Sequence, residues 1–127
     1  MAEGKFGTAI NCMDGRTQFP VANWIKEKFG IDYIDTITEP GVDKVMSSED
    51  AQKLEQVKSK VLISINKHGS TVVAVAGHYD CAGNPVSNDE HISQIKKSVD
   101  TIKSWGLQAT VVGLWVNENW QIEPVSE

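Results

Sequence analysis

The stretch Thr71-Val-Val-Ala-Val-Ala76 decides the fold, because six consecutive small or β-branched residues without a charge are typical of a strand buried on both faces. Such strands occur in parallel sheets that helices cover on both sides. The chain continues directly into Gly77-His78-Tyr79-Asp80-Cys81. Two side chains that bind metals, His78 and Cys81, are therefore expected where this strand ends.

Strand-like and helix-like segments alternate on either side of this stretch. Further strands are expected at 7–12, 32–37, 109–116 and 120–125, and helices at about 19–29, 47–68 and 89–105. Pro20 is expected at the first position of the first helix, and Gly30 just after its end. Ser47 is expected to cap the second helix, with Glu49 and Asp50 in its first turn.

This order predicts an α/β fold with a mostly parallel central sheet of four strands, a short antiparallel C-terminal strand, and helices on both faces. The 127 residues are enough for one hydrophobic core, so one domain over 1–127 is expected. In open sheets of this kind, ligands bind beyond the carboxyl ends of the strands, where the strand order reverses. If the first and third strands are neighbours there, Cys12 meets His78 and Cys81.

Composition excludes several classes of partner. A net charge of −5, with lysines scattered along the expected helices, argues against binding to nucleic acid or to an anionic membrane. No apolar run approaches the roughly 20 residues of a membrane span. The two cysteines and the absence of a signal-peptide pattern predict a cytoplasmic protein in a reducing compartment.

Cys12, His78 and Cys81 form a set of two thiols and one imidazole, which zinc takes when it keeps one position open for chemistry. Two residues separate His78 from Cys81, so one turn can present both to a single ion. Cys12 follows a different strand. The alternative at this point is a structural zinc, closed by a fourth ligand from Asp14.

Asp14 and Arg16 lie beside this set and share a face with Cys12, because side chains alternate along an extended segment. Asp14 is expected to accept a hydrogen bond from a zinc-bound hydroxide and to orient it. Arg16 is expected to keep Asp14 ionised through a two-pronged ion pair. Asp14 can also move onto the metal, so a free Asp14 predicts an open site and a bound Asp14 a closed one.

Other polar and aromatic residues receive structural interpretations. Asp80 is expected to serve the turn, and His91 to lie on the surface, with a proton relay as the alternative. The tryptophans are expected to be core or interface residues: Trp24, Trp105, Trp115 and Trp120.

The chain resembles the β-class carbonic anhydrases. The family's Cys-x-Asp-x-Arg motif matches Cys12, Asp14 and Arg16, and its His-x-x-Cys motif matches His78 and Cys81. The resemblance implies Zn²⁺ on the two cysteines and the histidine, beside an Asp–Arg dyad. It also implies reversible hydration of carbon dioxide to bicarbonate, and a homodimer or higher homo-oligomer whose neighbouring subunit supplies part of the cleft.

The chain also departs from the family pattern: it is shorter than typical members, it lacks their N-terminal helical arm, and Ala82 follows Cys81 where the family usually has glycine. Thr38-Glu39-Pro40-Gly41 stands where the family usually has Arg-Asn-Ala-Gly. Two alternatives to carbonic anhydrase activity follow from this departure and from the site's chemistry. One is hydrolysis of a carbon dioxide analogue, such as carbonyl sulfide or carbon disulfide, and the other is a non-catalytic zinc module with a regulatory or assembly role.

Overall fold

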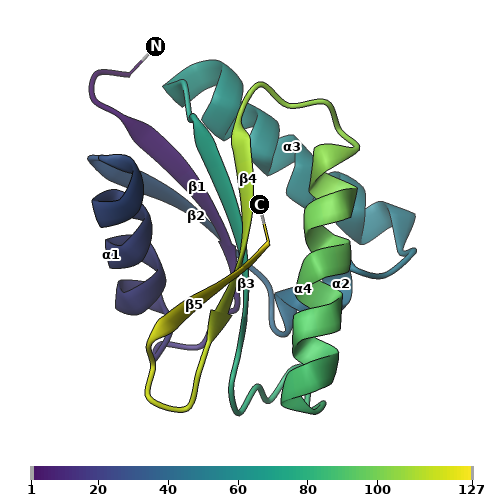
Figure 1. Ribbon diagram of the computed structural model, residues 1–127. Helices are drawn as coiled ribbons and strands as arrows, with labels where there is room; N and C mark the ends of the chain where they lie inside the picture. Colours follow the sequence, from purple (N-terminus) through teal and green to yellow (C-terminus); the bar gives the residue numbers. More distant parts are fainter. Residues whose placement is uncertain (1, 127) are drawn as a thin grey trace.

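A computed structural model, which describes residues 2–126, contains one five-stranded sheet with the strand order β2-β1-β3-β4-β5 (Figure 1). Four strands run parallel to one another, and β5 pairs antiparallel with β4. The strands are β1 (Phe6–Asn11), β2 (Tyr33–Thr38), β3 (Val72–His78), β4 (Thr110–Val116) and β5 (Ile122–Ser126). The expected mostly parallel sheet with an antiparallel C-terminal strand is confirmed.

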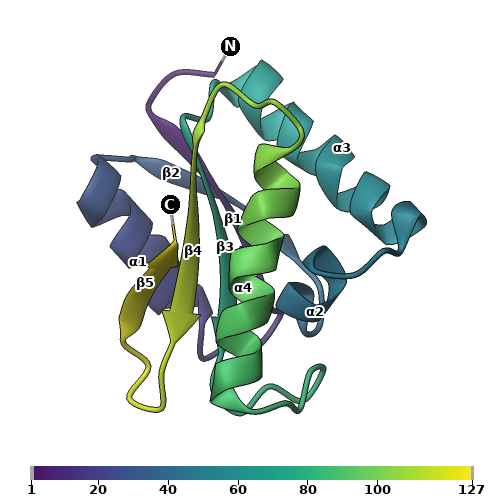
Figure 2. The ribbon, with the colours of Figure 1, turned by 45° about the vertical axis from the view of Figure 1, so that its right-hand side comes forward.

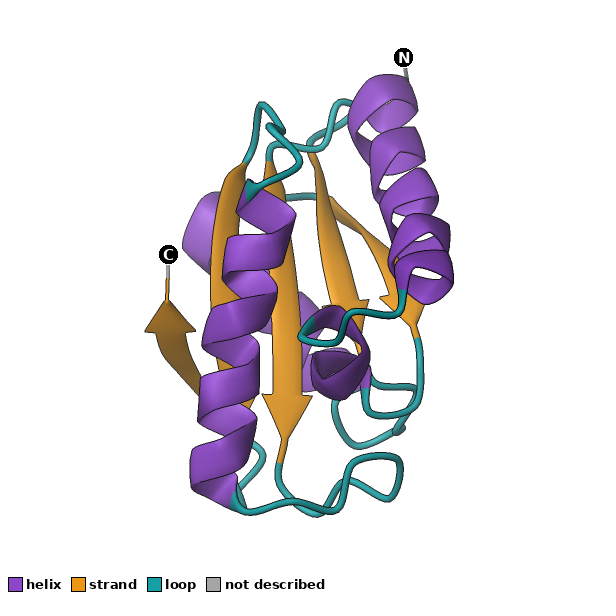
Figure 3. Ribbon diagram, turned by 90° about the vertical axis from the view of Figure 1, so that its right-hand side faces the viewer, coloured by secondary structure: helices purple, strands orange, loops and turns teal. Residues whose placement is uncertain are grey.

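Helices cover both faces of the sheet, as expected. Helix α1 (Gln18–Phe29) lies on one face, and the other face is covered by α2 (Val42–Met46), α3 (Ala51–His68) and α4 (Asn88–Lys103) (Figure 1). Figure 3 looks onto this second face, with the three helices in front of the strands. None of the helices in residues 2–126 is both long and apolar enough to cross a membrane.

Two hydrophobic clusters hold these layers together, one on each face. All seven residues of β3 are buried, because alternate side chains of this central strand face opposite layers. Val73 and Val75 pack in the cluster beneath α2, α3 and α4, whereas Val72 and Ala74 pack in the cluster beneath α1. The continuous apolar run in the sequence reflects this two-sided burial.

The helix starts differ from the expected ones. Asp50, not Ser47, caps α3, and its carboxylate accepts a hydrogen bond of 3.1 Å from the amide of Lys53. An aspartate directly before the helix satisfies an otherwise unpaired amide and also complements the helix dipole. Helix α1 begins at Gln18, so Pro20 is its third residue. The short helix α2 was not predicted, because five residues carry no periodic pattern.

The strand order places the predicted ligands at one edge of the sheet. Strands β1 and β3 are parallel neighbours, with Thr8 opposite Val73 and Ile10 opposite Val75. Cys12 directly follows β1, and His78 is the last residue of β3. Both therefore lie at the carboxyl ends of adjacent strands, where the order along the chain reverses.

Candidate metal centre

Cys12, His78 and Cys81 come together as the sequence predicted. One sulfur or ring-nitrogen atom from each lies within 4.8 Å of the other two, and all three residues are buried. Neither cysteine is in a disulfide. Among residues 2–126, this cluster is the group of histidine, cysteine and carboxylate side chains close enough to hold one metal ion, and Asp14 is not part of it.

The His78 ring has one nitrogen satisfied and one left without a partner. Its Nδ1 lies 2.7 Å from the carbonyl oxygen of Tyr79, which fixes the proton on Nδ1 when the ring is neutral. Its Nε2 is the one buried side-chain nitrogen or oxygen in the described chain without a hydrogen-bond partner. A buried imidazole in this state carries a free lone pair, and a metal ion would satisfy it. The donor set therefore fits zinc.

The two thiols of the metal-free site have different acidities. Burial alone would raise the pKa of the Cys12 thiol, but the His78 side chain and the backbone amides of Gly41 and Asp14 lower it to about 7. For Cys81, burial and the negative charge of Cys12 raise the pKa to about 11. The pKa of His78 is raised despite burial, chiefly through its interaction with Cys12. The three side chains therefore lie close enough to shift one another's acidity.

The stretch that departs from the family pattern takes part in this site. Gly41 precedes α2 in a left-handed conformation (φ 59°), and its amide donates to the sulfur of Cys12. A Cβ atom on Gly41 would lie 2.7 Å from the backbone of Gly83, so only glycine permits this approach. The turn between β2 and α2 therefore packs directly on the loop that carries Cys81.

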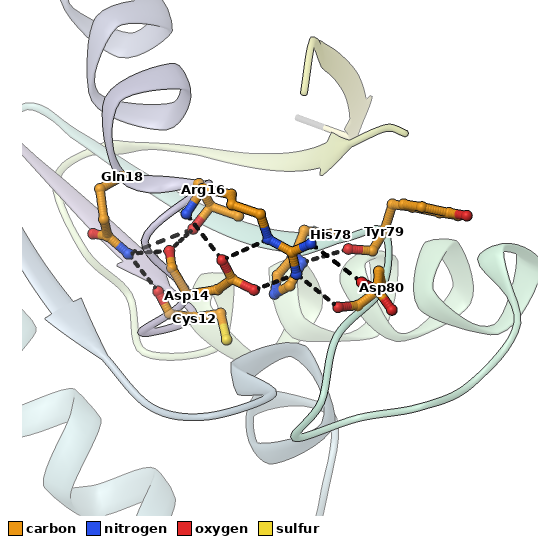
Figure 4. A network of polar contacts seen from close by, with 8 residues as sticks. Cys12, Asp14, Arg16, Gln18, His78, Tyr79 and Asp80 are labelled. Carbon is orange, nitrogen blue, oxygen red and sulfur yellow. Dashed lines mark hydrogen bonds and ion pairs between the residues drawn. The ribbon is translucent and has the colours of Figure 1, made fainter. Parts of the chain in front are cut away.

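Asp14 and Arg16 form the expected two-pronged ion pair, 2.7 Å between Nη2 and Oδ2 and 3.0 Å between Nε and Oδ1 (Figure 4). The backbone amide of Arg16 donates to Asp14 as well, over 2.9 Å. Hydrogen bonds from the Arg16 side chain hold the pKa of Asp14 down at about 2. Gln18 fixes the backbone of this loop, because its Nε2 donates to the carbonyl oxygens of Cys12 and Asp14 at 2.8 and 2.9 Å.

Two partners of Arg16 were not predicted. Asp80 accepts from Nη1 over 3.2 Å, and its backbone carbonyl accepts from Nη2 over 3.1 Å. The ring of Trp120 lies against the guanidinium, 4.4 Å from Cζ to the ring centroid. Asp80 therefore does more than serve the turn. The proximity of Asp80 to His78 and Cys81 in sequence is a signal that could have identified it, whereas Trp120 carries no such signal.

The prediction that His91 lies on the surface is wrong. His91 is buried, and its Nδ1 contacts a carboxylate oxygen of Asp43, which is also buried. The neighbouring α2 was not predicted, so the sequence offered no reason to bring these two residues together.

Two hollows on the protein lie apart from the cluster. One, of about 390 Å³, is lined by Trp24, Glu27 and Lys28 of α1. The other, of about 240 Å³, lies beside α2 and the start of α3. Cys12, His78 and Cys81 line neither, so neither hollow is assigned to the metal chemistry.

Comparison with known families identifies the chain. Residues 2–126 match the sequence family described as "Putative carbonic anhydrase". The chain belongs to this family. No curated protein matches the sequence. The carbonic anhydrase fold is also evident in three dimensions, because the chain is similar to the crystal structure of the β-carbonic anhydrase CafA of Aspergillus fumigatus, with a TM-score of 0.53. That match covers 95% of this chain and 74% of CafA at 10% sequence identity, so it concerns the fold.

Proposed function

We propose that this protein is a zinc-dependent carbonic anhydrase that catalyses the reversible hydration of carbon dioxide to bicarbonate. The observation that carries the proposal is the buried cluster of Cys12, His78 and Cys81, with the unpartnered Nε2 of His78, in a chain of the carbonic anhydrase family. A zinc ion on these three ligands would supply the nucleophile, since zinc lowers the pKa of a coordinated water molecule toward neutrality.

Hydrogen bonds within the chain orient His78 and stabilise the thiolate of Cys12, two of the residues that would hold this metal. Tyr79 orients the His78 ring through its carbonyl oxygen, so that Nε2 is the coordinating nitrogen. Gly41 and Asp14 donate backbone hydrogen bonds to the sulfur of Cys12, which stabilises the thiolate. Two thiolates and a neutral imidazole would cancel the charge of a divalent ion, and such an uncharged centre depends on nearby groups to polarise its substrate.

Asp14 supplies such a group in the proposed reaction. Arg16 holds its carboxylate ionised and in one orientation through two parallel hydrogen bonds. A carboxylate held in this way accepts a hydrogen bond from the reacting hydroxyl group, and this bond orients the reacting oxygen toward the substrate. In the reverse reaction, the same contact would select bicarbonate over carbonate, because only bicarbonate carries a hydroxyl group that can donate to Asp14.

The test combines metal analysis with stopped-flow carbon dioxide hydration on the purified protein. We expect one zinc per chain and a hydration rate that rises as the pH passes about 7. Cys12→Ser should lose zinc and activity together. Asp14→Asn should keep zinc but lose activity, by about 100-fold if the carboxylate directs the reacting oxygen. Asp100→Asn, at an exposed position on α4, is the matched control and should retain both.

A protein that carries one zinc per chain and does not hydrate carbon dioxide would contradict the proposal. Assaying carbonyl sulfide and carbon disulfide on the same preparation would then separate a hydrolase of these analogues from a non-catalytic zinc module. A homo-oligomer and a cytoplasmic location remain predictions, which sedimentation of the holoprotein and fractionation of cells would test.

A further inference from the structure

We propose that Asp80 and Trp120 are positioning residues that hold Arg16, and through it Asp14, away from the metal ligands. The inference rests on the proposed metal site. The Asp14–Arg16 pair alone does not explain what keeps Asp14 from occupying the fourth coordination position of the proposed metal. Those two residues lie on one loop and can move together.

Arg16 is the only arginine in the chain, and its guanidinium is occupied along its edges. Nε and Nη2 donate to the Asp14 carboxylate on one side. Nη1 donates to Oδ2 of Asp80 and Nη2 to the Asp80 carbonyl oxygen on the other, as Figure 4 shows. The planar group is thus fixed between two acidic residues, in the geometry for which guanidinium is suited and ammonium is not.

The face of the guanidinium has a partner of its own. Trp120 places its ring 4.4 Å from Cζ, within the distance for a cation–π contact. Contacts along the edges prevent the group from sliding within its plane, and a ring against its face prevents it from tilting. Asp14 is bound to the same guanidinium, so the orientation of the carboxylate follows that of Arg16.

The backbone gives independent support for this role. Asp80 (φ 57°) and Trp120 (φ 58°) are the two non-glycine residues of the described chain with positive φ. A left-handed conformation is uncommon for aspartate and rare for a bulky residue such as tryptophan. Such conformations persist where the surroundings impose them, and they cluster at functional sites. Here both occur at the residues that contact one side chain.

The anchors come from segments remote in sequence from Arg16. Asp80 lies in the loop between β3 and α4, and Trp120 in the turn between β4 and β5, at the same end of the molecule (Figure 2). The side chain of Asn117 accepts hydrogen bonds from the amides of Asn119 and Gln121, which fixes the turn around Trp120. Movement of Asp14 onto the metal would therefore require release of contacts to two other segments.

The first experiment observes Arg16 directly and does not need the metal. Because the chain has one arginine, nitrogen-15 NMR shows one arginine Nε–H signal, and its exchange with solvent reports how firmly the guanidinium is held. We expect exchange about three- to tenfold faster in Trp120→Ala, as loss of a cation–π contact predicts, and restored protection in Trp120→Phe. Asp80→Asn should accelerate exchange by a smaller factor, because the backbone carbonyl contact remains.

The second experiment asks whether the anchors act through Asp14. In the cobalt-substituted protein, azide binding at the open position is followed by visible absorbance. Trp120→Ala should weaken azide binding about three- to tenfold, because a released Asp14 competes for the same position. In the Asp14→Ala background, Trp120→Ala should then have no effect. Trp105→Ala, which removes a partly buried tryptophan at the far end of α4, is the control and should leave azide binding unchanged.

Each result bears on a defined part of the inference. Unchanged Arg16 exchange in Trp120→Ala, with the fold intact by circular dichroism, would overturn the positioning role. An equal loss of azide binding in both Asp14 backgrounds would show that Trp120 acts independently of Asp14, through the His78 ring 6.4 Å away or on the anion itself, and would overturn the link to Asp14. A wild-type protein that binds no cobalt would refute the proposed metal site and the link with it, whereas the exchange measurement would still decide whether Trp120 anchors Arg16.

Discussion

Nδ2 of Asn84 donates a hydrogen bond of 3.0 Å to Oδ1 of Asp43, and both side chains are buried. This contact joins the loop that carries Cys81 to helix α2. His91 contacts the other carboxylate oxygen, and the amide of Lys44 donates to Oδ1. A buried carboxylate lowers the stability of the fold unless both of its oxygens have hydrogen-bond partners. Asp43 and its partners therefore form one hydrogen-bonded network next to the loop of Cys81.

Asn84→Ala should destabilise the protein and weaken metal binding. It removes the buried donor to Asp43 and a second hydrogen bond of 2.6 Å to Gln94, so Oδ1 of Asp43 keeps only the Lys44 amide and the Gln94 oxygen loses its Asn84 donor. We expect a loss of about 2–3 kcal/mol in the free energy of unfolding, measured by urea denaturation. Because the backbone amide of Asn84 donates to the carbonyl oxygen of Cys81 over 3.3 Å, a shift of this loop after loss of the side-chain contacts would move Cys81, and zinc affinity measured against a chelator should fall by about tenfold.

The matched control is Asn88→Ala, which makes the same change at an exposed position at the start of α4. It should alter stability by less than about 0.5 kcal/mol and leave zinc affinity as it is. Equal effects of the two substitutions would contradict a special role for Asn84.

Gly77→Ala tests how tightly Asp43 packs against β3. A Cβ atom at this position would lie 2.5 Å from Oδ2 of Asp43 and 3.0 Å from Cδ1 of Ile95. Since the carboxylate is fixed by its hydrogen bonds, we expect the strand or α2 to shift, at a cost of about 1–3 kcal/mol in thermal or urea denaturation. Gly15→Ala meets nothing within 4 Å and should be nearly neutral. A neutral Gly77→Ala would show that Asp43 can move freely.

The sheet could be predicted because its signals are local. The apolar run 71–76 and the glycines at 30 and 69 mark a strand and two helix ends without reference to the rest of the chain. Helix α2 could not be predicted, since its five residues are held by contacts with α4 and with the loop around Gly83. The first residue of α3 could not be predicted from the sequence, because Ser47 and Asp50 are both acceptable caps.

The ligands could be predicted from spacing and strand position, but the residues that position them could not. Cys12 and Cys81 follow β1 and β3, and His78 ends β3; the sequence predicts these strand ends, and the strand order of the structure places them side by side. Trp120 reaches Arg16 only because the antiparallel turn after β4 brings it there. That turn conformation requires a positive φ at a residue type that rarely adopts one.

The metal-free protein should titrate its two thiols in separate steps. The interaction of Cys12 with His78 and backbone amides lowers its pKa to about 7, whereas burial raises the pKa of Cys81 to about 11. Thiolate absorbance in the ultraviolet, taken as the difference from the double variant Cys12→Ser/Cys81→Ser so that the signal of the two tyrosines cancels, should therefore rise first near pH 7 and again near pH 11. Cys12→Ser should remove the first step, and Cys81→Ser the second. A single step near the ordinary thiol pKa would show that the cluster does not form without metal.

The Asp14–Arg16 pair should stabilise the protein in a pH-dependent manner. Hydrogen bonds from Arg16 lower the pKa of Asp14 from 3.8 to about 2, so the folded state binds fewer protons than the unfolded state in this interval. Its contribution is complete above about pH 4 and is lost as the pH falls toward 2. Because the Arg16 side chain is 45% exposed, solvent screening limits this contribution to about 1 kcal/mol.

Urea denaturation of wild type and Asp14→Asn from pH 6 down to pH 2 measures this contribution. The difference between the two proteins should be about 1 kcal/mol at pH 6 and should approach zero near pH 2. Asp100→Asn, on the exposed face of α4, should show no such convergence. A difference that stays constant over this range would mean that Asp14 contributes through packing and not through its charge, and that Arg16 does not hold it ionised.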